Sequence, residues 1–164
     1  MLHQLVLIVS IREVGLRALK IVIRDADYLM IRKQRSGFET MKKTILLVDD
    51  SSMICHVVGN ILRDSGYEVL IARNGREGYD IAKKSVPRLI IMDLEMPVMD
   101  GIQATALIKS EPETTNIPIL IFTSLGSEND IKRATEAGCQ GFLNKPINKN
   151  IIQTEIQKLL GNSG

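Results

Sequence analysis

Cysteine and histidine are scarce in this chain of 164 residues. The two cysteines, Cys55 and Cys139, do not form a close pair, so we expect free thiols in a reducing cytoplasm rather than a disulfide framework. The two histidines, His3 and His56, are far apart in the sequence. The chain therefore contains no His/Cys cluster with the spacing of a zinc site.

Long apolar runs are also absent. No stretch approaches the roughly 20 residues that a membrane-spanning helix needs, so we expect no insertion into a membrane. The start of the chain, residues 1–11, is apolar but has no basic region before it and no small-residue cleavage site after it. It does not match a signal peptide.

A strong excess of one charge is lacking as well, because the formal net charge is only +2. Residues 1–40 hold seven Lys and Arg against four Asp and Glu, and residues 41–164 hold fourteen against fifteen. Neither the whole chain nor its larger part has the basic excess typical of nucleic-acid binding, and no helix-turn-helix pattern is present. We expect no nucleic-acid partner.

What the chain does contain is a regular alternation of strand and helix patterns from Thr44 onward. Short apolar runs typical of buried strands alternate with stretches whose apolar residues recur at helical spacing. The hydrophobic content of 45% is enough for a core. The expected strands are 44–48, 67–72, 88–92, 117–122 and 140–144, and the expected helices are 51–65, 75–84, 101–110, 128–137 and one capped by Asn148.

Five successive βα units predict an α/β fold. Right-handed crossovers place helices on both faces of a parallel sheet, which gives a doubly wound (βα)5 domain over residues 41–164. The flavodoxin-like strand order 2-1-3-4-5 is adopted from known folds of this class. Residues 1–40 are expected to be an N-terminal extension, either an over-extended start or an extra helix that packs on the domain or on a partner. Their apolar segments fit strands and helices equally well.

Polar residues close four of the expected strands. Asp49 and Asp50 follow the first strand, Asp93 the third, Thr123 the fourth and Lys145 the fifth. The carboxyl ends of parallel strands meet at one edge of the sheet, where ligand sites of open α/β folds lie. The sequence therefore predicts that three carboxylates, a hydroxyl and an ammonium group lie together. Each residue alone has an ordinary structural interpretation, and Asp50 could cap the following helix.

Crowded carboxylates repel one another, and a hard divalent cation relieves that repulsion. An open acidic site of this kind favours Mg²⁺. Asp93 is the best candidate nucleophile, because a carboxylate can accept a phosphoryl group. The transition state would spread charge over the phosphoryl oxygens, which Lys145 and Thr123 could stabilise.

These residues resemble the receiver domain of two-component response regulators. The resemblance extends from Met41 to about Leu160. It is carried by residues 45–51 (ILLVDDS), 92–101 (MDLEMPVMDG), 122–124 (FTS) and 145–146 (KP).

The resemblance implies a role for each matching residue. Asp93 would be the phosphoacceptor, with Thr123 and Lys145 as the phosphate-binding hydroxyl and lysine. Asp50 and Asp93 would bind Mg²⁺ directly, and Asp49 through water. The backbone carbonyl of Glu95 would complete the protein ligands.

The resemblance also implies a switch. Phe142 occupies the position of an aromatic switch residue where Tyr is common, and the Lys145–Pro146 bond is expected to be cis. The implied protein is a stand-alone, chemotaxis-type cytoplasmic receiver that takes its phosphoryl group from a histidine kinase or a histidine phosphotransfer protein. It would signal by binding another protein, with only self-phosphorylation and self-dephosphorylation chemistry of its own.

Three other interpretations compete with this one. A degenerate receiver could act as a constitutive scaffold. A haloacid-dehalogenase-type phosphatase also uses Mg²⁺ and an aspartate nucleophile, but needs a second Asp two residues later, where Glu95 follows Asp93 and Ser52 follows Asp50. A flavodoxin-like cofactor binder needs a loop that accepts phosphate after the first strand, where the two adjacent aspartates would repel it.

Overall fold

The computed structural model describes residues 6–7, 21–22, 43–124, 127–146 and 148–161. The chain divides into two compact units, Met1–Met41 and Lys42–Gly164. In the first unit, β1 (Val6–Leu7) pairs antiparallel with β2 (Ile21–Val22). The extra helix considered for residues 1–40 falls on residues outside the described part.

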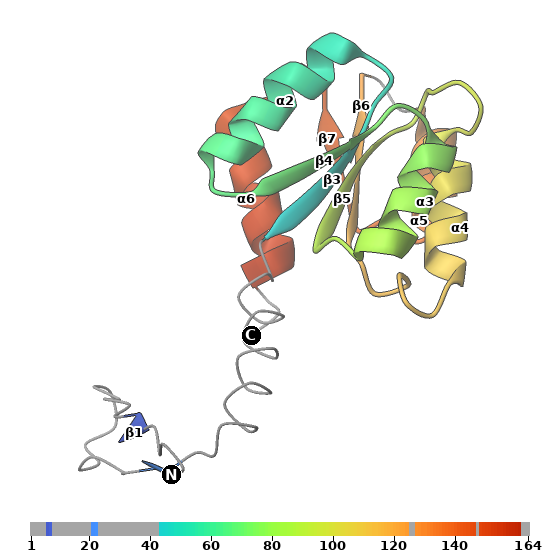
Figure 1. The fold of residues 1–164 in the computed structure, drawn as a ribbon. Helices are drawn as coiled ribbons and strands as arrows, with labels where there is room; N and C mark the ends of the chain where they lie inside the picture. Colours follow the sequence, from blue (N-terminus) through green and yellow to red (C-terminus); the bar gives the residue numbers. More distant parts are fainter. Residues whose placement is uncertain (1–5, 8–20, 23–42, 125–126, 147, 162–164) are drawn as a thin grey trace. The chain divides into compact units, whose positions relative to one another are not determined.

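The second unit is built on a parallel sheet of five strands (Figure 1). Every pairing in it is parallel, and the strand order is β4-β3-β5-β6-β7. In chain order this is 2-1-3-4-5, so the expected doubly wound fold is confirmed. The strands are β3 (Thr44–Val48), β4 (Glu68–Ala72), β5 (Leu89–Asp93), β6 (Ile119–Thr123) and β7 (Gly141–Asn144).

Helices cover both faces of this sheet (Figure 1). One face carries α2 (Ser52–Asp64) and α6 (Lys149–Gly161), whose buried side chains pack with alternate residues of the strands. The other face carries α3 (Gly75–Ser85), α4 (Gly101–Ser110) and α5 (Glu128–Glu136), which form a second cluster with the opposite strand residues. The three central strands are buried on both sides, which explains their nearly continuous apolar runs.

Local hydrogen bonds explain where the helices begin. Asn74 accepts a hydrogen bond from the Glu77 backbone at 2.9 Å, as expected for a helix cap. Ser51 caps the first helix of the domain through the Ile54 backbone at 3.3 Å, so Asp50 does not have the capping role that was its ordinary structural alternative. This leaves the Asp50 carboxylate available for another role.

Glycines end two of the helices. Gly66 and Gly138 have φ of 85° and 99°, a conformation that follows many helices and that glycine adopts without strain. Within the described residues, no helix is long and apolar enough to cross a membrane.

Candidate functional site

The carboxyl ends of the central strands bring the expected site residues together. Asp93 is the last residue of β5 and pairs with Phe122, and Thr123 is the last residue of β6 and pairs with Asn144. Asp49 directly follows β3. The backbone N–H of Lys145 donates to the Thr123 carbonyl at 2.9 Å, which fixes the end of β7 against β6.

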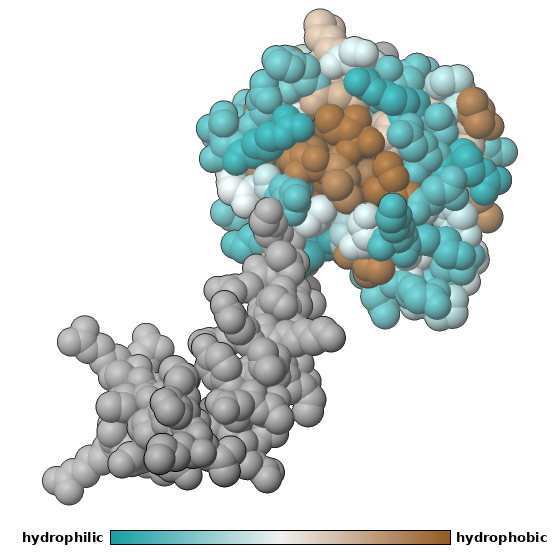
Figure 2. Space-filling view, in the orientation of Figure 1, coloured by the Kyte–Doolittle hydropathy of each residue, from teal (hydrophilic) through white to brown (hydrophobic). Residues whose placement is uncertain are grey.

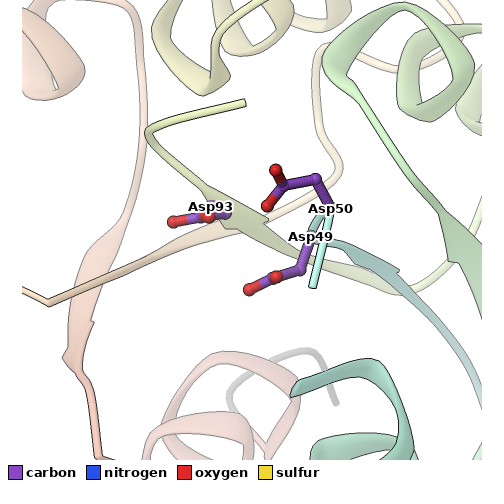
Figure 3. Close-up of side chains that lie close together, drawn as sticks. All are labelled: Asp49, Asp50 and Asp93. Carbon is purple, nitrogen blue, oxygen red and sulfur yellow. The ribbon is translucent and has the colours of Figure 1, made fainter. Parts of the chain in front are cut away.

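Three carboxylates form the centre of this site. Asp49, Asp50 and Asp93 each offer an oxygen within 4.8 Å of the others. Figure 3 shows the carboxylates of Asp49 and Asp93 extending from neighbouring strands in the same direction, with Asp50 beside them. Asp49 is fully buried and Asp93 is 7% exposed, whereas Asp50 is exposed. The cluster therefore reaches from the interior of the domain to solvent.

Lys145 supplies the positive charge that faces this cluster. Its Nζ lies 2.8 Å from Oδ2 of Asp49 and 3.1 Å from Oδ2 of Asp93. The same ammonium lies 4.9 Å from the centre of the Phe122 ring. One ammonium cannot balance three carboxylates, so the site keeps an excess of negative charge.

The three carboxylates differ in how many of their oxygens already have a hydrogen-bond or ion-pair partner. Asp49 accepts from the Ser51 backbone at 2.9 Å with Oδ1 and from Lys145 with Oδ2. Asp93 accepts from the Leu94 backbone at 2.9 Å with Oδ1, and its Oδ2 faces the Lys145 ammonium. Asp50 has no hydrogen bond or ion pair among the described residues. Its carboxylate is the one best placed to bind a cation directly.

Burial and charge shift the pKa of two of these groups. Burial raises the pKa of Asp93, Lys145 opposes that rise, and the repulsion from Asp49 adds to it. Burial alone would lower the pKa of Lys145, but hydrogen bonds and charge from Asp49 and Asp93 raise it overall. Lys145 therefore remains protonated beside the aspartates.

A cavity of about 290 Å³ opens over the nucleophile candidate, lined by Asp93, Glu95, Thr123, Ser124 and Lys145. Thr123 is 7% exposed at its wall. A carboxylate, a hydroxyl and an ammonium group thus face one small space. That space suits a phosphoryl group, whose oxygens need both hydrogen-bond donors and positive charge.

A second cavity, of about 460 Å³, adjoins the acidic cluster. It is lined by Asp50, Leu94, Glu95, Met96, Pro97, Asp100, Ile102, Asp130 and Arg133. Glu95 borders both cavities and is exposed. The expected role of its backbone carbonyl as a metal ligand stays a prediction.

The remaining expected residues lie near the site rather than in it. Phe142 is partly buried on β7, packs against the cluster that includes α3, α4 and α5, and pairs with Ile121. Its role as a switch stays a prediction. The Lys145–Pro146 peptide bond is cis.

Three residues at the site were not predicted from the sequence. The Ser51 backbone N–H donates to the Asp49 carboxylate, and the Phe122 ring lies beside the Lys145 ammonium. The buried Cys55 thiol donates to the Asp49 carbonyl at 3.2 Å. Burial raises the pKa of Cys55, which keeps it a thiol. Of these three contacts, the sequence could have indicated only that of Cys55 with Asp49, because Cys55 lies in the expected helix about one turn after the acidic pair.

Comparison with known proteins identifies a family for this architecture. The model of the response regulator receiver domain matches residues 45–157. The polar-differentiation response regulator DivK of Brucella anthropi is 30% identical over 123 residues, which cover 75% of this chain and 100% of the relative.

Solved structures agree with that match. The chemotaxis protein CheY4 of Vibrio cholerae superposes with a TM-score of 0.68 at 34% identity, over 71% of this chain and 97% of CheY4. The receiver domain of the sensor histidine kinase PA1611 from Pseudomonas aeruginosa gives a TM-score of 0.69 at 29% identity, over 73% and 98%. That structure has a magnesium ion coordinated in its active site cleft.

Proposed function

The chain belongs to the response regulator receiver domain family, and we propose that it is a phosphorylation-activated switch that carries its phosphoryl group on Asp93. The observation that carries this proposal is the Lys145 ammonium, which lies 3.1 Å from Asp93 at the mouth of a cavity that Thr123 also lines. Members of the family are signalling switches rather than turnover enzymes.

The proposed reaction is a phosphoryl transfer. An oxygen of Asp93 forms a bond to phosphorus while the phosphorus–nitrogen bond of a phosphohistidine breaks, and the imidazole nitrogen keeps the electron pair. Lys145 stabilises the charge on one phosphoryl oxygen, and the Thr123 hydroxyl donates to another. Later attack of water on phosphorus would break the bond to the Asp93 oxygen, release inorganic phosphate and leave Asp93 as a carboxylate.

Mg²⁺ fits the acidic cluster. By the family resemblance, Asp50 and Asp93 would bind it directly, Asp49 would act through water, and the Glu95 carbonyl would complete the protein ligands. When bound, the ion neutralises part of the charge on the phosphoryl oxygens. The magnesium ion in the PA1611 receiver domain supports this assignment.

The phosphodonor would be a histidine kinase or a histidine phosphotransfer protein. PA1611 itself is a sensor histidine kinase that carries a receiver domain of this fold. The matched DivK protein is covered over its full length, so that relative consists of this domain alone. We accordingly propose protein binding as the output, without a nucleic-acid contact.

The signal would spread through the strand ends. A phosphoryl group on Asp93 would draw Thr123 and Lys145 toward it, and the backbone bond between these two residues links any movement of β6 to β7. Phe142 on β7 would then turn inward and change the surface formed by α5, β7 and α6. This is a charge change that biases an element with two arrangements.

The proposed switch is confined to residues 41–164, and residues 1–40 form an extension outside it. Each catalytic and metal-binding role assigned above falls in the larger part. Nothing in the proposed transfer needs a group from the extension.

The test is the intact mass of the full chain after incubation with Mg²⁺ and a small acyl phosphate. One phosphoryl adduct is expected for the wild type and for Asp64→Asn, a matched control because Asp64 is exposed on α2. No adduct is expected for Asp93→Asn or without Mg²⁺. A folded wild-type protein that gives no adduct would instead be a degenerate receiver, and turnover of a generic phosphomonoester would favour the phosphatase interpretation.

A further inference from the structure

Cys55 connects the core of the domain to the acidic cluster, and the proposed switch gives it no role. It lies on α2, is 1% exposed, and belongs to the same apolar cluster as Val58 and Leu62. Side chains of β4 pack against this cluster, and Figure 2 shows the hydrophobic surface over β4 between α2 and α3. The Cys55 thiol therefore lies mainly among apolar side chains, and it donates to the Asp49 carbonyl at 3.2 Å.

The Asp49 carbonyl lies between the end of a strand and the start of a helix. β3 ends at Val48, and the Asp49 N–H donates to the Ala72 carbonyl at 3.1 Å. At the start of α2, the Cys55 N–H donates to the Ser51 carbonyl at 3.0 Å. Neither element provides a donor to the Asp49 carbonyl, and within the described residues the Cys55 thiol is its one hydrogen-bond donor. A buried carbonyl that loses such a partner is destabilised.

This carbonyl determines how the two adjacent aspartates are held. It belongs to the planar peptide unit that joins Asp49 to Asp50, so a bond that fixes the carbonyl also fixes the direction of the chain into Asp50. The Asp49 carboxylate has partners of its own in Ser51 and Lys145. The Asp50 carboxylate is exposed and has no partner among the described residues, so its position beside Asp93 (Figure 3) depends on the backbone.

We propose that Cys55 is a positioning residue for the divalent cation, because its thiol holds the Asp49–Asp50 peptide so that the Asp50 carboxylate stays beside Asp49 and Asp93. This role rests on the Mg²⁺ site of the proposed function, and Cys55 itself does not contact the ion. Ligands that are held in place before binding lose less conformational freedom when the ion binds, which raises the affinity. Removal of groups that orient metal ligands commonly lowers the affinity tenfold or more.

A role of Cys55 in packing alone would have a different consequence. Truncation of a residue that only fills the core lowers the stability of the fold, but leaves the affinity of the aspartates for a cation unchanged. Val58→Ala provides this comparison, because Val58 lies about one turn later on α2, is fully buried in the same cluster, and has no polar side-chain atom. Serine and alanine at position 55 provide the other comparison, because the two side chains are similar in size and only serine has a donor.

The experiment is a Mg²⁺ titration of the full chain at constant ionic strength, followed by the backbone amide signals of Ser51 and Leu94 in ¹⁵N–¹H NMR spectra. These amides donate to the carboxylates of Asp49 and Asp93, so their signals report on the site. Cys55→Ala should raise the dissociation constant of Mg²⁺ about tenfold. Cys55→Val, which fills the space but has no donor, should also raise it. Cys55→Ser and Val58→Ala should stay close to the wild type, and the same spectra establish that each variant is folded.

The rate of phosphoryl transfer from a small acyl phosphate provides a second measurement. A residue that acts only on cation binding changes the Mg²⁺ concentration needed for the half-maximal rate, and leaves the rate at saturating Mg²⁺ unchanged. We therefore expect Cys55→Ala to need about tenfold more Mg²⁺ and to reach the rate of the wild type at saturation. Cys55→Ser should match the wild type in both respects.

Equal Mg²⁺ affinities of Cys55→Ala and Val58→Ala would overturn the proposal. A Cys55→Ser variant that binds Mg²⁺ as weakly as Cys55→Ala would overturn it too, because the hydrogen-bond donor would then have no effect. Both outcomes leave the phosphorylation of Asp93 unaffected, since that is measured as the adduct on the wild type. A wild type that binds no Mg²⁺ would instead contradict the metal site of the proposed function, and the role of Cys55 with it.

Discussion

Two β-branched residues have backbone conformations that are unfavourable for them. Val86 and Val98 have φ of 42° and 70°, in the left-handed region where a branched Cβ crowds the backbone. The cost in that region is roughly 1–2 kcal/mol per residue. Val86 occurs where α3 ends, and its N–H donates to the Ala82 carbonyl at 2.9 Å. The helix end is therefore hydrogen-bonded but strained.

We expect Val86→Asn to raise the free energy of unfolding by about 1 kcal/mol, because asparagine tolerates this conformation and is common at helix ends. Little packing is lost, since Val86 is 51% exposed. Urea denaturation measures the change. Val86→Ile is the matched control, because it keeps the branched Cβ and should gain nothing. Equal stability of the Asn and Ile variants would show that the backbone strain is not relieved.

At the scale of the elements, patterning predicted the structure closely. The alternation of apolar runs located all five strands of the sheet, and the helices expected at 75–84 and 101–110 begin where α3 and α4 begin. Strand ends moved by one or two residues, as for β6, which begins at Ile119 rather than at 117. Such shifts arise because the end of a strand depends on which backbone groups are hydrogen-bonded to the neighbouring strand, and composition does not determine that.

Other features depend on contacts that the sequence does not reveal. Nothing about Val86 or Val98 signals a positive φ, because the conformation is imposed by the loops around them. The site residues could be predicted because the ends of parallel strands converge at one edge of the sheet. The hydrogen bonds that Asp49 accepts from the Ser51 backbone and the Lys145 side chain could not, because they depend on local backbone and side-chain geometry. The strand order was adopted from known folds, since distant pairing leaves no local signal.

The start of α4 packs directly against the backbone of Asp93 and so fixes the position of this site residue. A Cβ on Gly101 would lie 2.0 Å from the backbone oxygen of Asp93 and 2.9 Å from its carbonyl carbon. No rotation of a side chain can remove this clash. We expect Gly101→Ala to lower the free energy of unfolding by about 2–3 kcal/mol, as overpacking does in cores, and to reduce phosphoryl transfer because Asp93 must move.

Gly161→Ala is the control for that substitution. Gly161 is the last residue of α6, and a Cβ there meets nothing within 4 Å. The free energy of unfolding of Gly161→Ala should stay within about 0.5 kcal/mol of the wild type. Urea denaturation and the phosphoryl adduct, measured on both variants, provide the comparison. If Gly101→Ala unfolded and reacted like Gly161→Ala, the proposed close approach between α4 and β5 would be wrong.

The whole larger unit couples its stability to the acidic cluster. Its three carboxylates lie at the ends of strands buried on both faces, so their mutual repulsion acts on the sheet itself. A cation that binds only the folded state stabilises it in proportion to the logarithm of its concentration. At a free cation concentration of about 100 times the dissociation constant, the free energy of unfolding rises by about 2.7 kcal/mol.

We therefore expect Mg²⁺ to raise the thermal unfolding midpoint, and a chelator to reverse the rise. Asp50→Asn should remove most of the shift without disturbing the fold, because Asp50 is exposed and has no partner among the described residues. Asp64→Asn should keep the shift. The comparison is made at constant ionic strength with NaCl, because salt alone screens carboxylate repulsion. If Mg²⁺ and NaCl raised the midpoint equally, the cations would only screen the carboxylates. The ligand roles proposed for Asp50 and Asp93 would then be wrong, even if Asp93 were found to accept a phosphoryl group.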